Sequence, residues 1–260
     1  MRERISKSPV GKLLTLSQDV GIYECENFLL EGALKLYPFS HWLDHLVPLH
    51  VQLSAHYKEN AFQAGDDFLA LRAALGSTLR TAGFYQFAEM ILAATDEKSM
   101  NSIIIRQYTE ETPLYVQTNS LLRQGHAGGD ISNSPLAPWI CQLAAALRTI
   151  PEFTGVSFRG TQMDEQDLSE YQIGKIFIWA PFTSASKNIE ACLGGNVIFE
   201  LVPVSAISER GKRAPRDITS YSSFPDEEEV LLPMCCAYRP TSISKKDGVC
   251  WIRAEILDHY

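Results

Sequence analysis

The chain has 260 residues, which suffices for one large domain or for a core with an appended lobe. Its hydrophobic fraction of 45% and charged fraction of 21% are typical of a folded globular protein and exclude a largely disordered chain. The net charge of -8 argues against nonspecific nucleic-acid binding, which requires a basic surface. No apolar stretch is as long as a membrane span, so we predict neither a nucleic-acid partner nor a transmembrane segment.

The cysteines and the start of the chain bear on the cellular compartment. The six cysteines show no CxxC spacing, and Cys235 and Cys236 are adjacent, which predicts reduced thiols rather than a disulfide framework. The basic residues 1–12 are followed only by the apolar pair Leu13 and Leu14, too short for a secretory signal. We therefore expect a soluble protein that is secreted, if at all, by a non-classical route.

The first part of the chain has a helical pattern. From about residue 21 to residue 95, apolar residues recur three and four positions apart, and Gly and Pro are sparse. This predicts an N-terminal helical lobe over residues 1–95. Within it, His41 and His45 are one helical turn apart, a spacing that suits zinc, but no third ligand follows. We expect no metal.

Further along, the period of the pattern changes. Residues 112–125 and 139–149 are predicted to be helical, with a loop between them that is rich in Gly, Ser, Asn and Pro. After Pro151, short β-branched or aromatic runs alternate with turn residues. The predicted strands are 154–159, 176–179, 196–202, 229–233, 236–242 and 249–257, with a further one at 182–186. Strands that follow helices predict an α+β fold with a mostly antiparallel or mixed sheet, and we assign residues 96–260 to this core.

Two short motifs in this half suit ligand binding. Arg159 leaves a predicted strand into Gly160, so its guanidinium can bind a phosphate or a ribose while the glycine admits a ligand close to the backbone. Further on, Ser184 and Ser186 follow Phe182 at alternate positions and share one face of a strand. Each motif by itself is more often surface or turn chemistry than a site.

An acidic cluster, residues 226–229, runs directly into an apolar strand. If the strand pattern extends through it, Glu227 and Glu229 share one face and Glu228 points away. Two carboxylates on one face repel each other and attract a cationic partner. An isolated acidic run, however, is usually a solvated turn.

In this order, the three parts form an Arg, Ser, Glu-x-Glu series, and the chain resembles the R-S-E class of arginine-type, cholera-toxin-like mono-ADP-ribosyltransferases. Residues 108–123 look like the family's helix at the NAD site, which places Tyr108 there, and residues 218–233 are similar to its acceptor-recognition loop and catalytic strand. Ala185 stands where threonine is frequent. The resemblance implies two small, roughly perpendicular sheets around an NAD+ cleft, with no metal.

The resemblance also implies roles for these residues. Arg159 would hold a phosphate or ribose of NAD+, and the backbone of Gly160 would bind the nicotinamide amide. Ser184 would position Glu229, and Glu229 would accept a hydrogen bond from the 2'-hydroxyl of the nicotinamide ribose. Glu227 would orient or deprotonate the acceptor nucleophile.

Three aromatic residues add to this set. Phe182 can stack on nicotinamide, and Tyr221 and Phe224 can pack against a protein acceptor.

The chemistry supports this division between the two glutamates. Breaking the bond between nicotinamide and ribose develops positive charge at the anomeric carbon, and a fixed carboxylate stabilises that charge in the transition state. Glu229 suits this task. Glu227 can pair with an incoming guanidinium or take a proton from a hydroxyl.

These observations predict an NAD+-dependent protein mono-ADP-ribosyltransferase, with arginine as the acceptor by class. One alternative is a bacterial effector that acts in the host cytoplasm and modifies threonine on host ubiquitin. A second is an NAD glycohydrolase, in which water replaces the protein acceptor and Glu227 is not needed. A third is a noncatalytic binding module with a degenerate site.

Overall fold

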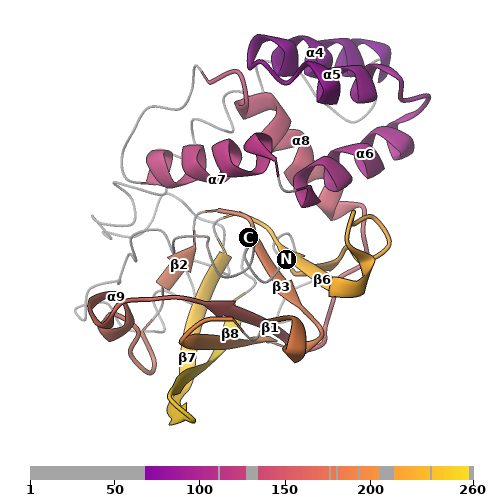
Figure 1. Cartoon of the computed structure of the whole chain (residues 1–260). Helices are drawn as coiled ribbons and strands as arrows, with labels where there is room; N and C mark the ends of the chain where they lie inside the picture. Colours follow the sequence, from indigo (N-terminus) through magenta and orange to yellow (C-terminus); the bar gives the residue numbers. More distant parts are fainter. Residues whose placement is uncertain are drawn as a thin grey trace, which may run out of the picture. The chain divides into compact units, whose positions relative to one another are not determined.

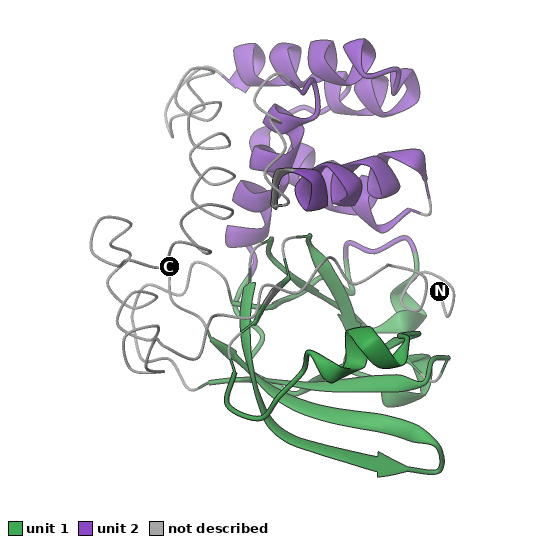
Figure 2. Ribbon diagram, turned by 90° about the vertical axis from the view of Figure 1, so that its left-hand side faces the viewer, with its two compact units in different colours: residues 1–44, 151–220, 224–260 green, residues 45–150, 221–223 purple. Residues whose placement is uncertain are grey.

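The computed structural model describes residues 68–110, 112–126, 134–175, 177–179, 181–192, 194–204, 214–234 and 236–257. These residues form two compact units (Figure 2). Unit 1 contains the described residues of 151–220 and 224–257, and unit 2 contains those of 68–150 together with 221–223. Most of the predicted N-terminal lobe, including His41 and His45, lies outside the described residues. The predicted boundary after residue 95 stays a prediction.

Unit 2 is built from helices (Figure 1). They are α4 (Phe68–Thr81), α5 (Tyr85–Leu92), α6 (Glu97–Thr109), α7 (Pro113–His126) and α8 (Ala137–Arg148). The predicted helices at 112–125 and 139–149 are confirmed as α7 and α8. Helix α6 was not predicted; it begins at a capping box in which Asp96 accepts from the Ser99 amide at 2.7 Å and Ser99 Oγ accepts from the Asp96 amide. Among the described helices, none has the length and apolar character needed to cross a membrane.

Unit 1 is built mainly from strands, and the α+β prediction is confirmed. The strands are β1 (Ser157–Thr161), β2 (Phe177–Trp179), β3 (Thr183–Ser186), β4 (Val197–Pro203), β5 (Arg216–Asp217), β6 (Glu229–Leu232), β7 (Cys236–Lys246) and β8 (Val249–Leu257). Three short helices lie between them: α9 (Glu165–Ser169), η1 (Ile189–Cys192) and η2 (Pro225–Glu227). The sheet is mixed, because β4 and β8 run parallel and the other described pairs are antiparallel.

The strands fall into two groups that meet at a narrow junction. The larger group contains β2, β7, β8, β4 and β1, and the smaller one contains β3, β6 and β5. Hydrogen bonds join the described strands in the order β2-β7-β8-β4-β1-β3-β6-β5. Strand β1 pairs with β4 along all of its residues, but it meets β3 only at Phe158 and Ser186. The two sheets implied by the resemblance are therefore two groups of strands in one continuous hydrogen-bonded order.

An aromatic cluster forms much of the core of unit 1. Its members are buried and lie on or next to the larger group of strands: Tyr171, Phe177, Trp179, Phe199 and Tyr238. The ring centroids of Trp179 and Tyr238 are 4.4 Å apart, and Trp179 Nε1 donates a hydrogen bond to the Tyr171 hydroxyl at 3.1 Å. Buried aromatic rings contribute strongly to stability, so this cluster gives the neighbouring strand β1 a rigid support.

Candidate active site

Arg159 links the first two parts of the motif series. It lies on β1, is 5% exposed, and its Nη1 donates a hydrogen bond to the carbonyl oxygen of Ser184 at 2.7 Å. Its Cζ lies 5.9 Å from the centre of the Trp179 ring. Within the described part of the chain this is the single hydrogen bond of the guanidinium, so further N–H groups are available for an anionic ligand.

Gly160 is required by close packing. A Cβ atom at this position would lie 1.8 Å from the carbonyl oxygen of Cys192 in η1. The Cys192 thiol in turn donates to the Phe158 carbonyl at 2.9 Å, and burial raises the pKa of Cys192 to about 11. This packing accounts for the glycine without a ligand, and its role in binding the nicotinamide amide stays a prediction.

Ser184 and Glu229 share one face of the β3–β6 pair. The residue directly opposite Glu229 is Ser186, whereas Ser184 is opposite Leu231 and so lies diagonal to Glu229. Glu229 is fully buried and Ser184 is 2% exposed. Ser184 Oγ has no hydrogen-bond partner among the described residues, so it makes no bond to Glu229 in this structure. Its role in positioning Glu229 stays a prediction.

The expected alternation of the glutamates is wrong at Glu227. The strand β6 begins only at Glu229, and residues Pro225–Glu227 form the 3-10 helix η2. Glu228 then adopts the left-handed conformation with φ of 47°. A proline fixes its own φ near the helical value and therefore favours a turn over an extended strand here. Glu227 and Glu229 are thus presented by two different backbone conformations, with Glu227 half-buried and Glu228 exposed.

The end of β3 holds this turn in place. Ser186 Oγ donates to the Glu227 carbonyl at 2.7 Å and accepts from the Asn188 amide at 2.8 Å. The Lys187 amide donates to the Glu228 carbonyl at 3.0 Å. The sequence predicted that Ser186 lies on the same face as Ser184, but it did not single out Lys187.

The predicted aromatic residues have different surroundings. Phe182 is buried just before β3, and Phe224 is 39% exposed just before η2. Tyr108 and Tyr221 belong to unit 2. Tyr108 is fully buried, and its hydroxyl accepts a hydrogen bond from Asn119 Nδ2 at 2.9 Å. The proposed contacts of these four residues with NAD+ or an acceptor stay predictions.

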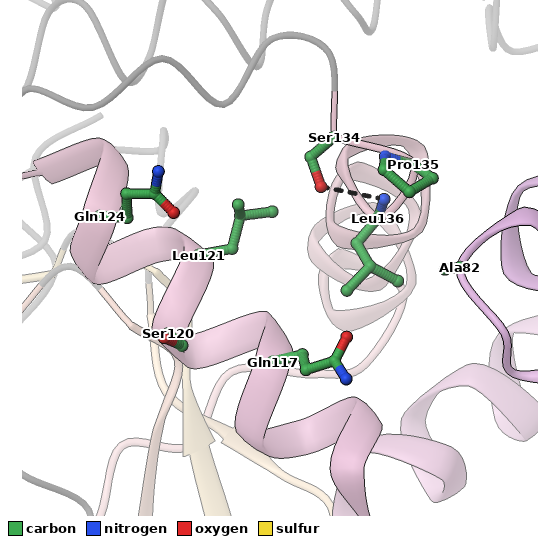
Figure 3. Close-up of a pocket in the computed structure, with 8 residues that line it drawn as sticks. All are labelled: Ala82, Gln117, Ser120, Leu121, Gln124, Ser134, Pro135 and Leu136. Atoms are coloured by element: carbon green, nitrogen blue, oxygen red, sulfur yellow. Dashed lines mark hydrogen bonds between the residues drawn. The ribbon is translucent and has the colours of Figure 1, made fainter.

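A separate pocket lies within unit 2 (Figure 3). Its volume is about 300 Å³, and it lies between α7 and the start of α8. The lining residues are Ala82, Gln117, Ser120, Leu121, Gln124, Ser134, Pro135 and Leu136. None of the predicted site residues is among them. The described ranges also contain no group of three or more His, Cys, Asp or Glu that could hold a metal ion.

Known proteins resemble the chain in sequence and in fold. The family described as "NAD:arginine ADP-ribosyltransferase" matches residues 88–256. A protein of Mycobacterium avium (strain 104), the "Putative NAD(+)--arginine ADP-ribosyltransferase Mav", is 30% identical over 125 residues. That match covers 46% of this chain and 14% of the relative, so the chain spans about one seventh of that protein's length.

Two solved structures from bacteria share the fold. The ADP-ribosyltransferase HopU1 of Pseudomonas syringae pv. tomato DC3000 has a TM-score of 0.55 at 19% identity, over 75% of this chain and 98% of that one. The type III effector XopAI of Xanthomonas axonopodis pv. citri has a TM-score of 0.54 at 20% identity, over 81% of this chain and 97% of that one. The ADP-ribosyltransferase fold is therefore confirmed. Because the family match also extends over more than half of the residues, the chain belongs to the NAD:arginine ADP-ribosyltransferase family.

Proposed function

We propose that the protein transfers ADP-ribose from NAD+ to an arginine side chain of a target protein and releases nicotinamide. The observation that carries this proposal is the face of the β3–β6 pair on which Glu229 and Ser184 lie. A fully buried carboxylate is diagonal to a buried hydroxyl that has no partner in the described part of the chain. A buried hydroxyl without a hydrogen bond lowers the free energy of unfolding by about 1–3 kcal/mol. Such a hydroxyl is expected at a site where a ligand supplies the missing partner.

These residues fit NAD+, which supplies the ADP-ribosyl group and the nicotinamide leaving group. Glu229 stabilises the positive charge that develops at the anomeric carbon and accepts a hydrogen bond from the ribose. Ser184 supplies a hydroxyl next to Glu229 that can bond either to it or to the ligand. Arg159, held by Ser184 and next to Trp179, keeps N–H groups for a phosphate or ribose oxygen.

The negative charge of residues 218–233 supports a cationic acceptor. Residues 218–233 contain four acidic residues, Asp226 to Glu229, and neither Lys nor Arg. Asp226 and Glu228 are exposed and Glu227 is half-buried, so negative charge is presented at the surface beside Glu229. A planar guanidinium is well matched to such carboxylates. In this proposal Glu227 orients the acceptor arginine.

The biological setting remains part of the proposal. XopAI is described as a type III effector, and the sequence of the present chain predicts a protein that acts on a host target in the host cytoplasm. Threonine of ubiquitin is the second candidate acceptor, and water is the third.

The test compares three matched variants of neighbouring residues. Wild type, Glu229→Gln, Glu227→Gln and Glu228→Gln are incubated with labelled NAD+ and a cell lysate. We expect Glu229→Gln to lose about 10²- to 10⁴-fold in both NAD+ consumption and protein labelling, because its carboxylate acts in the transition state. Glu227→Gln should lose protein labelling but retain NAD+ hydrolysis. Glu228→Gln, exposed and on the left-handed turn, should behave as wild type.

Mass spectrometry of the labelled protein identifies the acceptor. A modified arginine supports the proposal, whereas a stable product on threonine of ubiquitin would replace it with the second candidate. NAD+ consumption without any labelled protein would indicate a glycohydrolase. A wild-type protein that consumes no NAD+ would point to a noncatalytic binding module.

A further inference from the structure

Lys187 contacts both ends of the segment that carries Glu227. We call residues 218–228 the acceptor loop; it begins after β5 and ends at β6. At its end, the Lys187 amide donates to the Glu228 carbonyl at 3.0 Å. At its start, Lys187 Nζ lies 2.7 Å from Oδ2 of Asp217, the residue before the loop. One residue therefore holds the start through its side chain and the end through its backbone.

Asp217 also contacts the first turn of the loop, through hydrogen bonds with Thr219. While Oδ2 faces Lys187, Oδ1 accepts from the Thr219 amide at 3.1 Å and from Thr219 Oγ1 at 2.6 Å. Burial alone would raise the pKa of Asp217, but the hydrogen bonds from Lys187 and Thr219 outweigh it and hold the pKa below its usual 3.8. The carboxylate is thus charged at neutral pH and uses both oxygens.

The base of the loop is closed by backbone bonds as well. The Ile218 amide donates to the Glu229 carbonyl at 3.0 Å, and Asp217 is paired with Val230. The Lys187 ion pair is added to this closed base from the residue that directly follows strand β3. Because the loop is anchored at both ends, the position of Glu227 depends on both anchors.

We propose that Lys187 is a positioning residue that couples the two ends of the acceptor loop and thereby determines how Glu227 meets a guanidinium acceptor. This inference rests on the proposed function and names a determinant of its acceptor step. Small displacements of a reacting group lower a rate strongly, so a loop whose start is held by the backbone bonds alone, without the Lys187 ion pair, would serve the acceptor less well. Hydrolysis of NAD+ needs no ordered protein acceptor and depends much less on this coupling.

If the Lys187–Asp217 ion pair only stabilised the fold, its loss would mainly lower the melting temperature. The side chains of Lys187 and Asp217 are 25% and 40% exposed, and ion pairs of such exposure contribute little to stability. Loss of the pair should therefore change acceptor transfer far more than it changes the melting temperature.

The experiment measures the ratio of acceptor labelling to NAD+ hydrolysis, the KM for an arginine-containing acceptor, and hydrogen exchange of the peptide spanning residues 217–229. Lys187→Met should lower the ratio about tenfold, chiefly through a higher acceptor KM, and should speed exchange at Thr219. Lys187→Arg should restore most of the ratio. Lys246→Met, an exposed lysine at the end of β7, is the matched control and should leave both readouts as in wild type.

Each other outcome overturns the inference. An unchanged ratio in Lys187→Met does so, and so does an equal fall of transfer and hydrolysis accompanied by a lower melting temperature. Failure of the proposed function is recognised separately, because wild type would then neither consume NAD+ nor label protein. In that case the exchange data still decide on the coupling: faster exchange in Lys187→Met supports it, and unchanged exchange overturns it.

Discussion

In two strand pairs of unit 1, polar residues have opposite surroundings: they are buried in one pair and exposed in the other. In the β3–β6 pair every residue is buried, yet Ser184, Ser186 and Glu229 occupy one face. The β7–β8 hairpin is much longer (Figure 1), and the burial of its residues differs too, because residues 241–248 are exposed. Polar side chains cost little in the exposed hairpin, but in the buried pair they lower stability unless a partner or ligand satisfies them. Where a protein retains such a costly arrangement, function is the expected reason.

The largest difference in stability is expected between two glycines, Gly160 on β1, the strand next to the buried pair, and Gly248 in the hairpin turn. In Gly160→Ala the new Cβ would meet the Cys192 carbonyl oxygen at 1.8 Å, and backbone must move, so we expect a loss of about 2–4 kcal/mol in the free energy of unfolding. At the hairpin turn, Gly248 has open space around its Cα but a φ of 83°, so Gly248→Ala should cost about 1 kcal/mol. Denaturant unfolding measures both, and equal losses would contradict the close packing at Gly160.

A smaller effect, of opposite sign, is expected at Ser184. Ser184→Ala removes a buried hydroxyl that has no partner among the described residues, so the free energy of unfolding should stay constant or rise by up to about 1 kcal/mol, while the KM for NAD+ rises. The control is Ser244→Ala on the exposed part of β7, which should change neither quantity. Thermal unfolding and steady-state NAD+ hydrolysis test this pair. A clear destabilisation by Ser184→Ala would show that the hydroxyl is satisfied within the protein.

The smallest effect concerns the acid side of the pH profile. Because the folded pKa of Asp217 lies below 3.8, its ionised form stabilises the protein above that pH, and this contribution is lost as the pH falls through the folded pKa. Asp217→Asn should lower the free energy of unfolding at pH 7 by at most about 0.5 kcal/mol, since the side chain is partly exposed. Urea unfolding between pH 7 and pH 3 should show the difference from wild type shrink, with Asp247→Asn in the hairpin turn as control. A difference that grows on acidification would refute the assignment.

The strands were predictable where the pattern alternates regularly. The bounds of β8 agree with the prediction, β6 differs by one residue at one end, and β4 differs by one residue at each end. Strand β7 continues four residues past its predicted end, because the exposed residues 243–246 carry no apolar alternation. The turn Asp247-Gly248, with both residues at positive φ, was the signal that could have extended it. The two-residue strand β5 is too short for any periodicity.

The site was predictable as an ordered series of residues but not as a geometry. The sequence brought Arg159, Ser184 and Glu229 together, and the structure places them on the adjacent strands β1, β3 and β6. The alternation of side chains between two faces failed at Glu227 because it applies only to extended backbone, and Pro225 begins a 3-10 helix instead. The contact between Lys187 and Asp217 joins residues 30 positions apart, and no local pattern predicts such a pair.

The place of β8 in the sheet has a consequence for how the protein is made. This strand is the last described element of the chain, yet it lies between β7 and β4, with its parallel partner β4 some fifty residues earlier. During synthesis, β4 has no such neighbour until residues 249–257 have left the ribosome. Pairing between distant segments is slow because a long loop must close first. Unit 1 is therefore expected to complete its fold only after residues 249–257 have been made.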